Sequence, residues 1–111
     1  MEDAGSENPG MQVRIISGQQ NTDAHNVTLE VLDQDHTLGN AVRYVLAKDA
    51  DTDFVGYSIP HPSENKLHLR VQTRPGGPGT EALTVTKRAS DTLVGMCDHM
   101  LKKLEHGLAE K

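Results

Sequence analysis

The histidines and the single cysteine are the side chains best suited to bind a metal, and their spacing argues against a metal site. The chain has no His-x-x-x-His or Cys-x-x-Cys pair, the spacings that zinc sites commonly use. Asp33, Asp35 and His36 lie close together, but acids in a turn usually cap and solvate it. The histidines are scattered singly, at His25, His36, His61, His68, His99 and His106. We therefore expect no metal site.

Nucleophilic and acid–base chemistry also lacks its usual arrangements. Cys97 and His99 are two residues apart in a helical pattern, which places them on different faces, so we interpret Cys97 as a small buried apolar residue. There is no Gly-x-Ser-x-Gly elbow around a serine nucleophile. The glycine-rich loop at 75–79 lacks the Gly-Lys-Ser/Thr that would hold phosphate and magnesium. We expect no catalytic residue and no bound cofactor.

Composition points to a small protein that needs a partner. The chain has 111 residues, enough for one domain, but only one Phe, two Tyr and no Trp to fill a core. The net charge is −5 and the eleven basic residues are scattered, which disfavours direct nucleic-acid binding. One cysteine and no long apolar run predict a soluble intracellular protein without a disulfide or membrane span.

Hydrophobic patterns predict the first half of the fold. Residues 1–24 are expected to be a flexible N-terminal segment with one short candidate strand at 11–16. Residues 25–32 alternate between apolar and polar side chains, which is typical of a strand. Thr37 is a suitable N-cap for a helix of about twelve residues that ends near Lys48.

The second half predicts a hairpin and a long helix. Strands at 53–59 and 66–73 flank a six-residue connection with two prolines. Residues 80–111 are helical, although the β-branched run 84–86 is a poor helix start and Gly95 lies inside the helix. We expect an α+β fold over 25–111: one antiparallel sheet of about four strands with two helices on one face, the C-terminal helix long.

The long helix is the strongest sign of a second chain. Its apolar residues step by three or four, and at ~1.5 Å per residue it exceeds about 40 Å, beyond the reach of a small sheet. Gly39 is the other sign. A glycine near a helix start costs about 1 kcal/mol against alanine, so it is either tolerated or allows another backbone to approach. Arg43 and Tyr44 either anchor an interface or remain solvated.

Three ordered blocks carry a resemblance to a known family. They read DHTLGNAVRY at 35–44, FVGYSIPHPSE at 54–64 and LRVQT at 69–73. Together they resemble the small α-like subunit of eukaryotic and archaeal RNA polymerases over about residues 25–110. Residues 43–45, 63–64 and 96–98 are most similar to the version shared by RNA polymerases I and III.

The resemblance implies a fold like the dimerisation domain of the bacterial α subunit. It implies an obligate heterodimer with a larger α-like subunit that nucleates assembly of the enzymes making rRNA, 5S rRNA and tRNA. It also implies contact with the second-largest subunit, a location in the nucleus including the nucleolus, and no catalytic residue, metal or direct nucleic-acid contact. The polymerase II or archaeal counterpart, a free-standing homodimeric module, and a small enzyme using Asp33, Asp35 and His36 are the alternatives.

Two sets of residues are expected to carry the function. The heterodimer interface is predicted at Thr37, Leu38, Gly39, Asn40, Val42, Arg43, Tyr44, Leu46, Leu93, Met96, Cys97, Met100, Leu101 and Leu104. A turn shared with the family is predicted from Gly56, Tyr57, Pro60, His61, Pro62 and Glu64.

Overall fold

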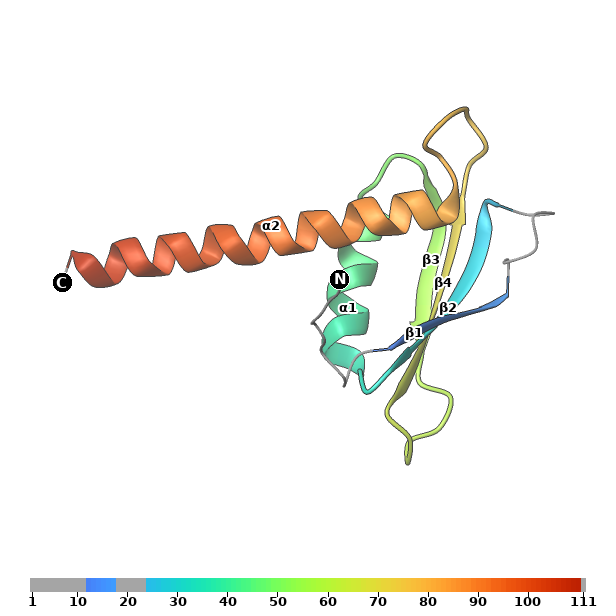
Figure 1. Ribbon diagram of the computed structural model, residues 1–111, viewed down its shortest axis with the longest axis horizontal. Helices are drawn as coiled ribbons and strands as arrows, with labels where there is room; N and C mark the ends of the chain where they lie inside the picture. The colour runs from blue at the N-terminus through green and yellow to red at the C-terminus, as the bar shows by residue number, and fades with distance from the viewer. Residues whose placement is uncertain (1–11, 18–23, 111) are drawn as a thin grey trace, which may run out of the picture.

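The computed structural model describes residues 12–17 and 24–110, which form four strands and two helices (Figure 1). Their order along the chain is β1 (Val13–Ser17), β2 (Asn26–Leu32), α1 (His36–Ala47), β3 (Thr52–Ser58), β4 (Lys66–Thr73) and α2 (Ala82–Ala109). The predicted α+β class and the long C-terminal helix are confirmed. Flexibility was predicted for residues 1–24, and most of that segment lies outside the described residues.

The strands form one antiparallel sheet in the order β1-β2-β4-β3. The register between β2 and β4 sets Val27 opposite Val71 and Leu29 opposite Leu69, so the apolar positions of both strands share one face. The predicted hairpin is β3–β4, whose first strand begins and ends one residue earlier than expected. The connection is therefore 59–65.

The start of the sheet lies before the predicted domain boundary at residue 24. β1 occupies Val13–Ser17, close to the short strand expected at 11–16, and pairs with β2. Val13 lies opposite Val31 and Ile15 opposite Leu29. The division of the chain at residue 24 remains a prediction, but β1 belongs to the same sheet as the rest.

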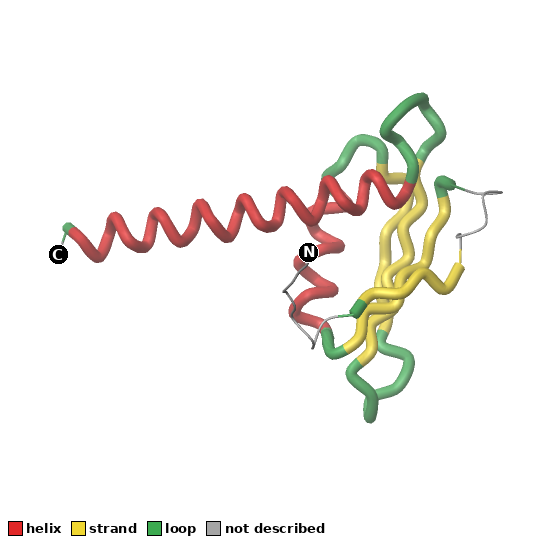
Figure 2. The backbone as a smooth tube through the Cα atoms, in the orientation of Figure 1, coloured by secondary structure: helices red, strands yellow, loops and turns green. Residues whose placement is uncertain are grey.

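Both helices lie on one side of the sheet, where they cover its apolar face (Figure 2). Because strand side chains alternate between faces, one face collects the core and the other stays open. The ten buried apolar residues come from two strands and two helices: Val27, Leu29 and Val31 of β2, Leu67, Leu69 and Val71 of β4, Leu46 of α1, and Ala82, Val85 and Ala89 of α2.

The N-cap of α1 differs from the prediction. The helix begins at His36, and Asp35 is the cap: its Oδ1 accepts a hydrogen bond from the Thr37 backbone amide at 3.1 Å. Thr37 is thus inside the first turn, and its prediction as the cap was wrong. Asp35, in extended conformation, accepts from a free amide of the first turn and adds a negative charge that the helix dipole favours.

α2 is one continuous helix of 28 residues that leaves the sheet after its first third (Figure 1). The β-branched run does not break it, because Val85 is fully buried and the Thr86 hydroxyl donates to the Ala82 carbonyl at 2.7 Å. Gly95 also lies within the unbroken helix. Among the described residues, no helix is apolar over a length that would cross a membrane.

Candidate protein-protein interface

The distal part of α2 carries an uncovered row of apolar side chains, which we call the distal stripe. Its exposed members are Val94, Met96, Cys97, Met100, Leu101, Leu104 and Leu108. Met100 is 69% exposed and Leu104 is 58% exposed, although such side chains are normally buried. The row continues the face by which Ala82, Val85 and Ala89 pack on the sheet, since all step by three or four.

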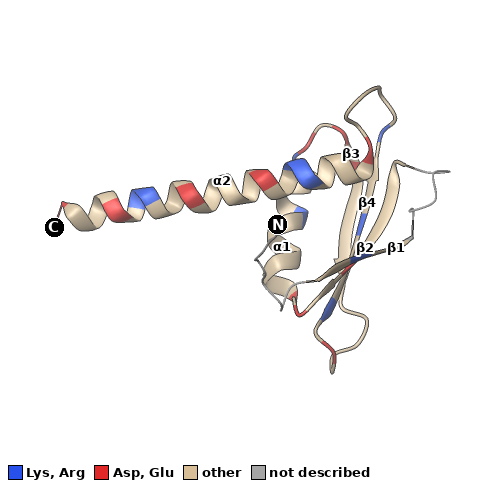
Figure 3. Cartoon of the chain, in the orientation of Figure 1, with Lys and Arg blue, Asp and Glu red and all other residues tan. Residues whose placement is uncertain are grey.

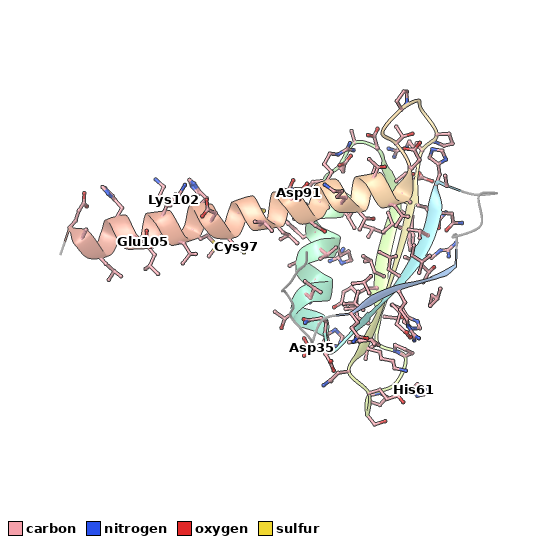
Figure 4. All side chains as sticks on the ribbon, viewed as in Figure 1. Asp35, His61, Asp91, Cys97, Lys102 and Glu105 are labelled. Carbon is pink, nitrogen blue, oxygen red and sulfur yellow. The ribbon has the colours of Figure 1, made fainter. Side chains whose placement is uncertain are left out.

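The opposite side of α2 is charged. Three ion pairs follow i, i+4 spacing along it: Lys87–Asp91 at 3.5 Å, Asp98–Lys102 at 3.3 Å and His106–Glu110 at 2.9 Å. Figure 3 shows acidic and basic residues recurring along the free part of the helix, and Figure 4 shows Cys97 and Lys102 well beyond the sheet. A helix with one apolar and one charged face is built to be covered on the apolar side.

An apolar groove of about 330 Å³ lies where the distal stripe meets the sheet. Its lining comes from β1, β2, α1, β4 and α2: Val13, Leu29, Val31, Leu38, Val42, Leu67, Leu69, Thr86, Ser90, Leu93 and Val94. Leu93 and Val94 join the groove to the distal stripe. The groove and the stripe therefore form one continuous apolar surface.

The predicted interface residues of α1 fall into separate groups. Leu38 and Val42 are half-buried and line the groove, as an interface would require. Four others are exposed: Thr37, Asn40, Arg43 and Tyr44. The Tyr44 ring lies under the Lys48 ammonium, with 4.8 Å from Nζ to the ring centroid.

Gly39 and Leu46 cannot contact a partner, which corrects their prediction as interface residues. Both face the chain's own sheet, two helical turns apart, and Leu46 is fully buried. A Cβ on Gly39 would lie 2.7 Å from Leu67 Cδ1 and from ring carbons of Tyr57. The close approach that glycine allows is therefore that of α1 to its own sheet.

Cys97 is also placed differently from the prediction. It was expected to be buried in the helix, but it is exposed because α2 has already left the sheet at that point. The other predicted residues of α2 lie on the apolar surface: Leu93, Met96, Met100, Leu101 and Leu104.

The residues predicted as a family turn do not all form a turn. Gly56 and Tyr57 belong to β3, and the Tyr57 hydroxyl is 2.9 Å from His36 Nδ1 at the start of α1. Pro60, His61, Pro62 and Glu64 are exposed in the β3–β4 connection. Figure 4 shows His61 at the end of the sheet away from α2, so this loop is not part of the apolar surface.

The acids and histidine that could have suggested chemistry have structural roles. Asp35 caps α1, and His36 contacts Tyr57. Asp33 adopts a positive φ of 61°, and its backbone amide donates to the Asn65 carbonyl at 2.6 Å. In the described ranges, no three His, Cys, Asp or Glu side chains gather in a metal-binding group.

Sequence reasoning missed the sheet residues of the groove and the ion pairs that fix the elements. Leu29, Leu67 and Leu69 are core residues, at most 6% exposed, that also line the groove, and no pattern in the sequence indicates this second role. Arg88 binds Asp49 and Asp51 in the α1–β3 connection. Arg14 and His68 both bind Glu30. These pairs are 16 to 39 residues apart in the chain, and no local pattern indicates them.

Comparison with known proteins connects this surface to a family of dimerising subunits. Residues 26–103 match the family model described as the RNA polymerase Rpb3/Rpb11 dimerisation domain. The DNA-directed RNA polymerases I and III subunit RPAC2 of Schizosaccharomyces pombe is 42% identical over 94 residues, which cover 85% of this chain and 73% of the relative. The subunit of the same name from Drosophila melanogaster is 37% identical over 95 residues, 86% of this chain and 87% of the relative.

A solved structure agrees in fold. The crystal structure of DNA-directed RNA polymerase subunit L from Thermoplasma acidophilum superimposes with a TM-score of 0.70 over 86% of this chain and 87% of that one, at 22% identity. The matched segment, 26–103, contains most of the groove and more than half of the distal stripe. The chain belongs to the RNA polymerase Rpb3/Rpb11 dimerisation-domain family.

Proposed function

We propose that this chain is a non-catalytic assembly subunit of RNA polymerases I and III, which forms a heterodimer with a larger α-like subunit. The names of the Schizosaccharomyces pombe and Drosophila melanogaster relatives support the choice of polymerases I and III over polymerase II or an archaeal enzyme. The heterodimer nucleates assembly of the enzymes that make rRNA, 5S rRNA and tRNA, and it acts in the nucleus, including the nucleolus.

The observation that carries this proposal is the uncovered apolar surface. Large contiguous apolar patches on soluble proteins generally mark interaction sites. Here the patch runs from the groove beside Leu38 and Val42 to Leu108 near the end of the described helix. A partner helix lying along α2 covers the distal stripe, while the partner's adjoining element fills the groove. The second-largest subunit then binds the assembled heterodimer.

The chain itself is not expected to bind nucleic acid directly. The net charge of −5 and the scattered basic residues disfavour phosphate binding. The isolated chain is expected to be marginally stable or to aggregate, because its apolar surface is exposed without a partner.

The test is co-expression with a larger α-like subunit, followed by size-exclusion chromatography with light scattering. The wild type should give a 1:1 complex. The double variant Met100→Glu and Leu104→Glu should abolish it, because two carboxylates would be buried without partners. The control variant Thr92→Glu and His99→Glu adds the same two glutamates to exposed positions outside the distal stripe and should leave the complex intact.

Two results would overturn the proposal. If the Met100 and Leu104 variant assembled as well as wild type, the interface would lie elsewhere. If the chain formed a homodimer that the larger subunit did not displace, the free-standing homodimeric module would be the better description.

A further inference from the structure

The sheet has a second surface, on the side opposite the helices, that the proposed heterodimer does not use. We call it the open sheet face, and define it by Arg14, Glu30, Phe54, Lys66, His68 and Arg70. The register places these residues on the same side: Arg14 and His68 both lie opposite Glu30, and Phe54 lies opposite Gln72, two residues from Arg70. In Figure 1 both helices are on the other side of the sheet.

The open sheet face is more basic than the chain as a whole. It carries three cations and one carboxylate in a chain of net charge −5. The carboxylate, Glu30, is already satisfied: Arg14 Nε donates to Oε1 at 3.0 Å, and His68 Nε2 is 3.0 Å from Oε2. Its side chain is only 8% exposed. Glu30 therefore does little to repel an incoming anion.

Arg70 is the cation best placed to bind an anion on this face. It is exposed, and its two side-chain hydrogen bonds reach neutral oxygens, Thr28 Oγ1 at 3.2 Å and Gln72 Oε1 at 3.3 Å. Lys66, by contrast, is 3.5 Å from Glu64 Oε1 in the adjoining turn. If a carboxylate of a ligand replaced these two neutral oxygens, it would form a charge-assisted, bidentate pair with the Arg70 guanidinium.

A shallow hollow of about 340 Å³ lies beside Arg70. Phe54, Gly56, Ser58 and His68 line it together with Arg70. Gly56 has no side chain to fill the space, and a Cβ there would lie 3.2 Å from Phe54 Cζ. Phe54 is 49% exposed, although phenylalanine is normally buried. The hollow thus offers an apolar wall next to a cation.

We propose that the open sheet face is a second docking surface, which takes an extended acidic polypeptide segment: one carboxylate pairs with Arg70, and a neighbouring apolar side chain packs against Phe54 over Gly56. β3 is an edge strand of the sheet, so an extended segment alongside it finds backbone hydrogen-bonding groups as well. A nucleic acid fits less well, because it requires several clustered cations. The proposal does not depend on the heterodimer, which uses the other side of the sheet.

The probe is a fluorescein-labelled twelve-residue peptide that contains three glutamates and two phenylalanines. Its anisotropy is measured with the full chain, in the oligomeric form in which it purifies. A matched peptide carries glutamine in place of each glutamate, and a single-stranded RNA of twelve nucleotides is tested in parallel. We expect saturable binding of the acidic peptide below about 1 mM, and about tenfold weaker binding of the glutamine peptide.

Two variants locate the site. Arg70→Gln should weaken binding of the acidic peptide about tenfold, and Phe54→Ala should weaken it as well. Arg74→Gln is the matched control, because Arg74 is another exposed arginine that bonds to the Ala50 carbonyl and lies 3.7 Å from Asp53. It should bind like wild type. Absence of saturable binding, equal losses in the Arg70 and Arg74 variants, or preference for the RNA would each overturn the proposal.

Discussion

Arg88 of α2 holds Asp49, which lies just after α1, through two parallel hydrogen bonds: Nε to Oδ2 and Nη2 to Oδ1, both 2.9 Å. Nη2 also reaches Asp51 Oδ2 at 2.9 Å. Arg88 lowers the pKa of Asp49, and the two carboxylates raise that of Arg88. The contact is made next to Ala89, the last α2 residue buried in the core. It therefore fixes α2 where the helix leaves the sheet.

The first prediction is that Arg88→Ala broadens the range of orientations of the distal part of α2 relative to the sheet. Without the bidentate pair, the buried packing of the base of α2 rests on the small residues Ala82, Val85 and Ala89. Spin labels on Cys97, the only cysteine, and on an introduced Ser63→Cys report the distance between stripe and sheet. The distance distribution should widen in the variant. Lys87→Ala, whose ion pair with Asp91 stays within α2, is the control and should leave it unchanged.

If the two variants gave equally narrow distributions, Arg88 would be a surface ion pair of little consequence, as many are. If both gave equally broad distributions, the base of α2 would be flexible for reasons unrelated to Asp49. Only a difference between Arg88→Ala and Lys87→Ala supports the positioning role.

Periodic patterns were enough to predict the elements, because each pattern is local. The alternation of Val27, Leu29 and Val31 marks a strand whichever strand lies beside it. The spacing from Ala82 to Leu108 marks a helix and, through its length, a surface that this sheet cannot cover. The fold class and the distal stripe could therefore be predicted from the sequence alone.

What could not be predicted is which neighbour each apolar residue meets. In the sequence, Leu38, Val42 and Leu46 share one apolar face of α1, and Gly39 lies about 100° round the helix from it. In the structure, Gly39 and Leu46 face the sheet while Leu38 and Val42 face the groove. The helical period shows which residues of α1 share an apolar face. It does not show which of them pack on the chain's own sheet and which line the groove. Arg88 and Asp49 are 39 residues apart, beyond the reach of any local pattern.

The second prediction concerns acid stability and Glu30. Arg14, and then His68, lower the pKa of Glu30 below its usual value of 4.5, with a further contribution from Lys66. Because the pKa is lower in the folded state, the stabilisation is complete above about pH 4.5 and is lost as the pH falls through the folded value. Glu30→Gln should be less stable than wild type at pH 7, and the difference in urea midpoint should shrink below pH 4.5. A constant difference from pH 7 to pH 3 would contradict this.

The third prediction is that Thr73→Val stabilises the chain. Thr73 lies opposite Thr52 in the β3–β4 pair, and the side-chain oxygens of both are buried with no hydrogen-bond partner among the described residues. Replacing a buried, unpaired hydroxyl by a methyl group removes a desolvation cost on the order of 1 kcal/mol. The melting temperature should rise. Thr28→Val is the control, since Thr28 Oγ1 accepts from Arg70, and it should give no increase; equal increases would mean that β propensity alone is responsible.

The fourth prediction compares Gly39 of α1 with Gly95 of α2, because the space around the two glycines differs. A Cβ on Gly39 would lie 2.7 Å from Leu67 Cδ1 and from carbons of the Tyr57 ring, whereas a Cβ on Gly95 would meet nothing within 4 Å. Alanine gains about 1 kcal/mol of helix propensity at either position. At Gly39 this gain is opposed by overpacking, which typically costs ~1–3 kcal/mol.

Gly95→Ala should therefore raise the melting temperature of the purified chain or its complex, and Gly39→Ala should leave it unchanged or lower it. Gly39→Leu should lower it further, because a larger side chain must push α1 away from Leu67 and Tyr57. The loss should already be present when the chain is measured without a partner, since the obstructing atoms belong to its own sheet. The opposite result would be that Gly39→Ala and Gly39→Leu, measured without a partner, are as stable as wild type and fail only to form the heterodimer. The glycine would then serve the contact with the partner, and α1 would have to lie further from Leu67 and Tyr57 than the 2.7 Å distances from a Gly39 Cβ indicate.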